Sequence, residues 1–185
     1  TFTLSRQWYI MSGRLTKPFE YVVSFAQGTD TFNLLDAWLN VNFDTRLQFK
    51  IGRMWTPFGY EFYNVPTNAL INGERSLFYN NVGPNRDEGI MAWGQLFQDR
   101  IGYGVGIFNG IRNGFVDTND FKSVIGLINF RPFSQQKGSL LENFNVGGSV
   151  DFGKVDNVPS VNPFRTSVNT AGNTVVGPEF LQLNS

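Results

Sequence analysis

The stretch NLLDAWLNVNFDTRLQFKI, residues 33–51, alternates apolar and polar side chains on both sides of a short turn at Asp44-Thr45. Before the turn, one face carries Leu35, Ala37, Leu39, Val41 and Phe43, and the other carries Asp36, Trp38, Asn40, Asn42 and Asp44. After it, Leu47, Phe49 and Ile51 oppose Arg46, Gln48 and Lys50. A period of two places each set on one side of a sheet, so the stretch predicts an antiparallel hairpin with one apolar and one polar face.

The same kind of run, about ten β-prone residues followed by a turn signal, recurs along the chain and is typical of a membrane barrel. We predict eight strands, over residues 3–12, 18–27, 33–43, 46–54, 88–97, 101–109, 121–131 and 143–152. Brief turns are expected at 13–17, 44–45 and 98–100, and a long loop at about 55–87. The barrel would occupy residues 1–152, and residues 153–185 are predicted to be a long loop or an unfinished connection.

Composition limits the chemistry. The chain has no Cys and no His, which excludes disulfides, thiolate metal sites and the common histidine-based catalytic arrangements. Fifteen basic residues balance fifteen acidic ones, so there is no electrostatic footprint for nucleic acid. We therefore predict no enzyme activity, no metal, no cofactor and no nucleic-acid partner.

Aromatic residues make up 16% of the chain and gather near the ends of the predicted strands. Trp8, Phe43, Trp55, Trp93 and Phe97 are examples. This placement suits the aromatic girdles of a membrane barrel, where amphipathic rings lie at the depth of the lipid headgroups. Ordinary core packing is the alternative for any one of them.

Four segments together carry a family resemblance. They are NLLDAWL at 33–39, IGRMWTPFGYE at 51–61, GERSLF at 73–78 and GVGIFNG at 104–110. Their order and spacing resemble the phosphate-selective porin O and P family of Gram-negative outer membranes, over about residues 1–131. That resemblance implies a sixteen-stranded, usually trimeric barrel with loops folded into the pore and basic residues along an anion path.

The predicted fold is accordingly all-β, an antiparallel transmembrane β-barrel with about eight strands here, half of a sixteen-stranded barrel. The sequence departs from the family pattern in three ways. It holds about half the strands, and an export signal would have to lie elsewhere, so we expect a partial chain. It has Trp55-Thr56 where the family often has a basic residue before the proline, and its charges balance.

Basic residues of the fourth predicted strand and the following loop are the candidates for an anion path: Arg46, Lys50, Arg53, Arg75 and Arg86. The loop itself would form a constriction through Pro57, Phe58, Gly59, Glu61 and Glu74. A guanidinium fork suits phosphate or carboxylate geometry. The alternative is that these cations form structural ion pairs with nearby carboxylates such as Asp36, Asp44 or Glu61.

The predicted function is an outer-membrane porin for passive diffusion of small hydrophilic solutes, with a weak preference for anions such as phosphate. Its expected partners are the lipid bilayer, lipopolysaccharide, the solutes and two further copies in a homotrimer. Two alternatives stay open at this point. One is a structural or adhesive outer-membrane barrel with a plugged lumen, and the other is a soluble β-sandwich that binds carbohydrate.

Overall fold

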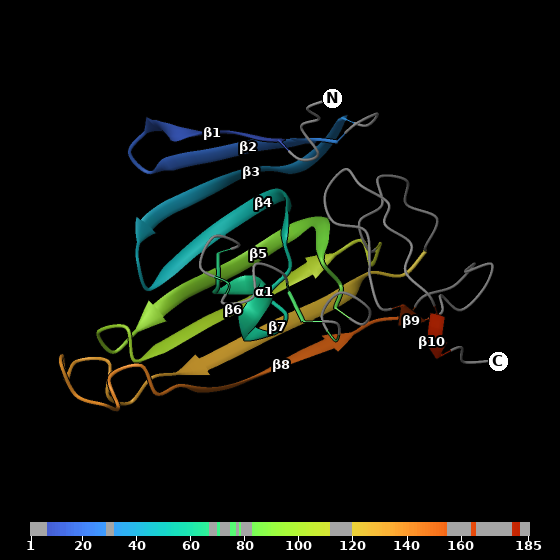
Figure 1. Ribbon diagram of the computed structural model, residues 1–185. Helices are drawn as coiled ribbons and strands as arrows, with labels where there is room; N and C mark the ends of the chain where they lie inside the picture. The colour runs from blue at the N-terminus through green and yellow to red at the C-terminus, as the bar shows by residue number, and fades with distance from the viewer. Residues whose placement is uncertain are drawn as a thin grey trace, which may run out of the picture.

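The computed structural model describes residues 7–28, 32–66, 70, 75–76, 78, 83–111, 120–154, 164–165 and 179–181. Eight strands form one sheet: β1 (Gln7–Thr16), β2 (Phe19–Gln27), β3 (Phe32–Asp44), β4 (Leu47–Trp55), β5 (Arg86–Leu96), β6 (Ile101–Phe108), β7 (Ser123–Phe130) and β8 (Val146–Phe152). Each strand pairs antiparallel with the next in the chain, as Figure 1 shows. The fold class is therefore the predicted one.

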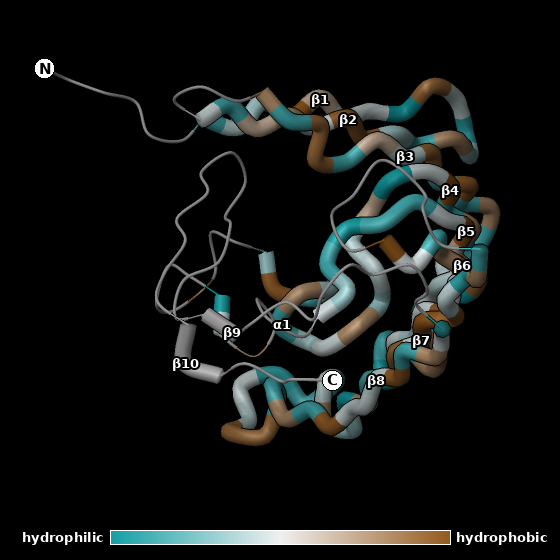
Figure 2. Tube along the Cα trace, turned by 90° about the vertical axis from the view of Figure 1, so that its right-hand side faces the viewer, coloured by the Kyte–Doolittle hydropathy of each residue, from teal (hydrophilic) through white to brown (hydrophobic). Residues whose placement is uncertain are grey.

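The sheet curves strongly, and the short helix α1 (Tyr60–Tyr63) lies on its concave side (Figure 2). In the described part of the chain, β1 and β8 are the edge strands and the sheet does not close on itself. β9 (Phe164–Arg165) and β10 (Glu179–Leu181) pair separately within the predicted tail. No helix among the described residues is long and apolar enough to cross a membrane.

The predicted alternation is confirmed where β3 meets β4. Leu39 pairs with Ile51 and Asn40 pairs with Lys50, so each pair shares a face. On the convex face Phe49 and Ile51 are 48% and 50% exposed, whereas Asn40 and Gln48 on the concave face are 1% and 5% exposed. Val146 and Val150 of β8 are likewise exposed. Apolar side chains therefore face outward and polar ones inward along these strands.

Leu35 is an exception to that alternation. The register between β2 and β3 shifts at this point: Ser24 pairs with Asp36, but the next residue, Phe25, pairs with Leu34. Leu35 therefore has no register partner on β2. The side chain of Leu35 is buried. The prediction that it belongs to the outward apolar face is therefore wrong, because an extra residue in one strand interrupts the period of two.

The first hairpin also differs from the prediction. A turn was expected over 13–17, but β1 continues to Thr16 and the chain turns at Lys17 and Pro18, which are joined by a cis peptide bond. Gly13 lies inside the strand instead of in the turn. A Cβ atom there would stand 3.1 Å from the Tyr21 ring, so the glycine makes room for an aromatic side chain on β2.

The concave face is less polar than the alternation alone predicts. Met54, Met91, Phe108 and Ile125 form a buried cluster contributed by β4, β5, β6 and β7. Trp38, Phe58, Tyr63 and Trp93 pack against it. Two of these rings belong to the segment that follows β4. The cluster thus provides an apolar surface on the concave side of the sheet, against which this segment packs.

Candidate functional site

The segment after β4 folds onto the concave face and crosses it. Thr56 starts the crossing, and its backbone N–H and its hydroxyl both donate to the Asn85 carbonyl, at 3.1 and 2.8 Å. Gly59 has a φ of 70°, a conformation that favours glycine, and its N–H donates to Ser149 Oγ on β8 at 3.1 Å. This part of the predicted constriction loop is thereby held at the start of β5, in the middle of the sheet, and at the edge strand β8.

A glycine on β6 lets the segment approach the wall. A Cβ atom at Gly104 would stand 3.1 Å from Pro57 Cβ and 3.3 Å from the Tyr63 hydroxyl. Such contacts are too close for a larger residue unless the loop moves. The alternate glycines of GYGVGIF, residues 102–108, therefore provide space inside the curve of the sheet, where α1 lies.

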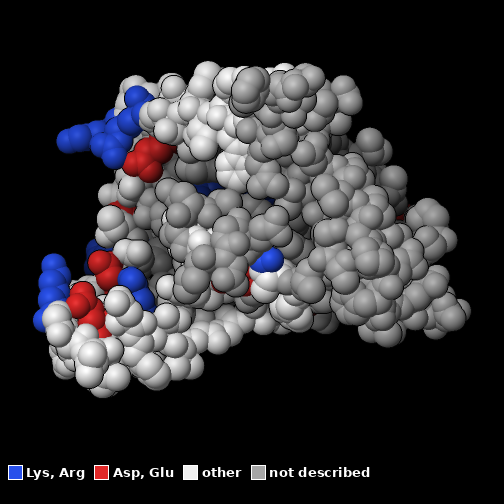
Figure 3. All heavy atoms as spheres, viewed as in Figure 1, with Lys and Arg blue, Asp and Glu red and all other residues white. Residues whose placement is uncertain are grey.

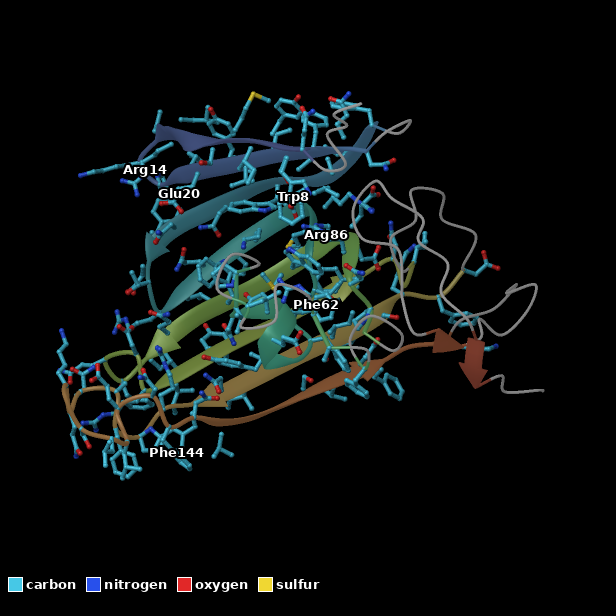
Figure 4. All side chains as sticks on the ribbon, in the orientation of Figure 1. Trp8, Arg14, Glu20, Phe62, Arg86 and Phe144 are labelled. Carbon is cyan, nitrogen blue, oxygen red and sulfur yellow. The ribbon has the colours of Figure 1, made fainter. Side chains whose placement is uncertain are left out.

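Beside α1, two arginines share one indole ring. The Cζ atom of Arg86 lies 3.8 Å from the ring centroid of Trp55, and that of Arg75 lies 5.1 Å from it. Arg75 also lies 4.7 Å from the ring of Phe62 on α1. Figure 4 shows Phe62 and Arg86 on the same concave side. Trp55 therefore contacts cations on the concave side of the sheet and is not part of an outer aromatic girdle.

Arg75 also ties the loop to itself. Its Nη1 donates to the Glu61 carbonyl, and its Nη2 donates to the Val65 carbonyl at 3.1 Å. The Glu61 carboxylate accepts from the Ser76 N–H at 2.6 Å. Burial lowers the pKa of Arg75, but a guanidinium remains charged at physiological pH. Glu74, the other acidic candidate of the constriction, lies outside the described residues.

The remaining arginines of this region have carboxylate neighbours. Arg86 Nε donates to Asp36 Oδ1 on β3 at 2.9 Å. Arg53 follows Gly52, whose φ of 122° interrupts the regular strand, and its side chain is buried with Nη1 4.0 Å from Glu88 Oε1. The structure thus brings Arg53, Arg75 and Arg86 into one region and places acidic groups among them.

Lys50 lies elsewhere on the concave face, between two tryptophans. Its ammonium nitrogen is 4.2 Å from the ring centroid of Trp38 and 4.9 Å from that of Trp93. Trp93 Nε1 donates to Asn40 Oδ1 at 2.9 Å, which fixes the indole. This position differs from the predicted one, because the sequence pattern predicts Trp93 in the aromatic girdle. Trp93 pairs in register with Gln48, which faces the concave side, so the Trp93 side chain faces the concave side as well. That pairing is the signal that could have predicted its position.

Arg46 stands apart from the other cations. It lies in the turn between β3 and β4 and pairs with Asp44 at 2.6 Å, with 72% of its side chain exposed. Hydrogen bonding with Asp44 raises the pKa of Arg46. Charged side chains gather at the end of the sheet that carries such short turns, as Figure 3 shows. Of the five candidates for the anion path, Arg46 therefore lies away from the loop, at the turn end of the sheet.

A pocket of 250 Å³ opens between α1 and the wall formed by β5, β6 and β7. Tyr60, Tyr63 and Asn64 line it from the loop side, and Trp93, Gln95, Asn129 and Arg131 are among the residues that line it from the sheet. Sequence analysis did not predict this pocket, because its residues come from four separate segments that meet only through strand register and loop folding; the alternate glycines of β6 are the one local hint of space there.

Comparison with known protein families gives a match over most of the chain. The model of the family described as "Putative beta-barrel porin-2, OmpL-like" matches residues 8–170, which is most of the chain. No curated protein matches the chain, and no solved structure does. The expected porin character is confirmed at this level, but the matching family is not the phosphate-selective porin O and P family that the four motifs resemble.

Proposed function

The chain belongs to the OmpL-like β-barrel porin-2 family, and from that premise we propose that it provides a path for passive diffusion of small hydrophilic solutes across an outer membrane. One observation carries the proposal: the sheet turns apolar side chains outward and polar ones inward, with a loop seated on its concave side. A wall of this kind suits lipid on one side and water on the other. The proposal concerns a passive path and not catalysis.

A weak preference for anions such as phosphate is the finer part of the proposal. Three guanidinium groups, those of Arg53, Arg75 and Arg86, gather at the loop. Asp36 and Glu88 stand beside two of them and offset much of their field. A narrow pore strengthens what remains, because charges interact more strongly there than in bulk water. The balance supports a modest preference and not a dedicated phosphate path.

A structural barrel with a plugged lumen is the competing proposal. It is favoured by the apolar cluster beneath the loop, because Met54 and Phe108 give the loop a firm seat. Single-channel conductance distinguishes the open porin from the barrel with a plugged lumen. Assembly as a homotrimer and contact with lipopolysaccharide stay predictions, and gel filtration with cross-linking in detergent would test the first.

The test is reconstitution of the full chain into planar lipid bilayers with recording of single-channel currents. We expect discrete conductance steps. Across a salt gradient, we expect a small reversal potential whose sign shows that anions pass more readily than cations. Swelling of liposomes in small sugars and salts would show passage of uncharged solutes. Insertion without conductance steps, together with liposomes that do not swell, would favour the plugged barrel and contradict the porin proposal.

A further inference from the structure

We propose that the pocket between α1 and β5–β7 binds one ring of a neutral saccharide as it passes along the concave face. The inference rests on the proposed diffusion path and names a solute class for it. The volume of 250 Å³ lies below the range of about 300–1,000 Å³ that is usual for ligand pockets. A site of this size suits a single sugar ring held weakly, as a diffusion path requires.

The lining offers aromatic surface. Tyr60 and Tyr63 approach from α1, and Trp93 faces them from β5. Trp93 is held by its hydrogen bond to Asn40 and by the ammonium of Lys50 near its ring, so its orientation is fixed before any ligand arrives. The C–H face of a pyranose ring is apolar and packs against aromatic rings, which also present a negative face to polarised C–H groups.

The lining also offers paired donors and acceptors. Asn64, Gln95 and Asn129 supply amide groups, each with donor and acceptor atoms that match neighbouring sugar hydroxyls. Asn129 is 7% exposed, and its buried Oδ1 has no hydrogen-bond partner among the described residues. A buried amide oxygen without a partner is costly, so a ligand hydroxyl or a water that reaches it would be favoured.

Charge favours a neutral ligand at this site. Arg131 is the single charged side chain among the described lining residues, and its Nη2 already donates to the Asp99 carbonyl at 2.9 Å. Burial raises the pKa of the Tyr63 hydroxyl, which donates to Met91 Sδ at 3.6 Å, so this group adds no charge to the pocket. The arginines that would attract an anion, Arg75 and Arg86, line no part of this pocket. Its chemistry is therefore that of a polyhydroxylated ring.

A glycine of the wall permits a selective block. Gly102 lines the pocket, and a Cβ atom placed on it would have open space around it. Gly102→Leu therefore fills the pocket without a clash at the backbone. Gly148 on β8 is equally open, but its partner Ile128 is 56% exposed on the convex face. Gly148→Leu is thus a matched control that adds the same side chain away from the pocket.

The experiment is saturation-transfer-difference NMR with maltose, on the full chain in a zwitterionic detergent that carries no sugar head group. We expect a saturable signal for wild type and for Gly148→Leu, and at least a tenfold weaker affinity for Gly102→Leu. Asn64→Ala, at the exposed end of α1, should weaken binding several-fold. Circular dichroism checks that each variant keeps its sheet, and Asn64→Ala decides the matter if Gly102→Leu does not fold.

The absence of a saturable maltose signal from folded wild type would overturn the inference, and so would full affinity in folded Gly102→Leu. If Gly102→Leu does not fold, full affinity in Asn64→Ala overturns it. Bilayer recordings on the same preparations separate the two proposals. Conductance without maltose binding removes the saccharide site and leaves the diffusion path. Maltose binding without conductance leaves the site and contradicts the path.

Discussion

Arg86 on β5 donates a hydrogen bond from Nε to Asp36 Oδ1 on β3, across the intervening strand β4, and both side chains are largely buried. Removing one partner of such a pair leaves an uncompensated charge. We expect Asp36→Ala to lower the free energy of unfolding by about 3–5 kcal/mol. Urea unfolding in detergent, followed by tryptophan fluorescence, would measure the loss.

The pair of Arg14 and Glu20 is the control, because its nitrogen and oxygen lie 2.7 Å apart but its arginine is 56% exposed. Glu20 also accepts from the amides of Asn40 and Asn42, so the control removes the arginine instead. Arg14→Ala should cost about 1 kcal/mol or less, as is usual for surface pairs. Asp36→Asn combined with Arg86→Gln should recover part of the loss of Asp36→Ala, because no buried charge is left unpaired. Equal losses in Asp36→Ala and Arg14→Ala would contradict the assignment of a buried pair.

Arg75 is the cation best placed to influence the selectivity of the path. It lies on the loop that covers the concave side of the sheet, near Trp55 and Phe62. We expect the anion preference to fall in the order wild type, Arg75→Gln, Arg75→Glu, because the charge falls by one unit at each step. Reversal potentials in a salt gradient would measure this order. The differences should shrink as the salt concentration rises, since ions screen the charge.

Arg46→Glu provides the comparison for Arg75. Arg46 is exposed in a turn and already paired with Asp44, so its replacement should move the reversal potential much less. A larger shift at Arg46 than at Arg75 would place the selective region at the turns and not at the loop. A wild type that prefers cations would remove the anion proposal altogether.

Sequence reasoning succeeded where local patterns decide the structure. The alternation of residues 33–51 predicted β3, β4 and their two faces, because a period of two is a property of the strand itself. It failed at Leu35 and could not orient Arg53, because a register shift and the positive φ of Gly52 interrupt the period. Neither feature is visible in the residue pattern alone.

The inner site was harder to predict, because it depends on contacts between distant segments. Trp55 and Trp93 read as girdle residues, yet Arg86 and Lys50 hold them on the concave side. The saccharide pocket likewise depends on the loop, which is seated by the contact of Gly59 with Ser149, ninety residues away. Only the alternate glycines of β6 hinted at that space.

The convex face gives a prediction that depends on depth in the membrane. Ile51 lies in the middle of β4 between Leu39 and Ile90, its register partners. In a bilayer, Ile51→Arg should lower the free energy of unfolding by about 2–4 kcal/mol, the cost of arginine near the midplane. Phe43→Arg, near the end of β3, should cost about 1 kcal/mol or less, because it lies near the interface.

Unfolding of the two variants in lipid vesicles, with the same measurement in detergent, would test this dependence. An equal and small cost at both positions in vesicles would mean that the convex face does not meet lipid. Such a result would favour a soluble sheet over a membrane wall and would count against the diffusion path as well.

The last prediction concerns the loop as an obstruction. Residues 56–63 occupy the concave side, with Phe58 and Tyr63 against the apolar cluster and Gly59 bonded to β8. Deleting residues 62–72 should raise single-channel conductance, because it removes Phe62 and Tyr63 from the concave side. Deleting residues 135–140, which lie in the exposed turn between β7 and β8, is the matched control and should leave conductance nearly unchanged. Ser149→Ala should give an intermediate result, with noisier open-channel currents, because the loop keeps its contacts with the apolar cluster but loses its hydrogen bond to the edge strand β8. If the 62–72 deletion folds and conducts no better than wild type, the loop does not limit the path, and the narrowest point lies elsewhere.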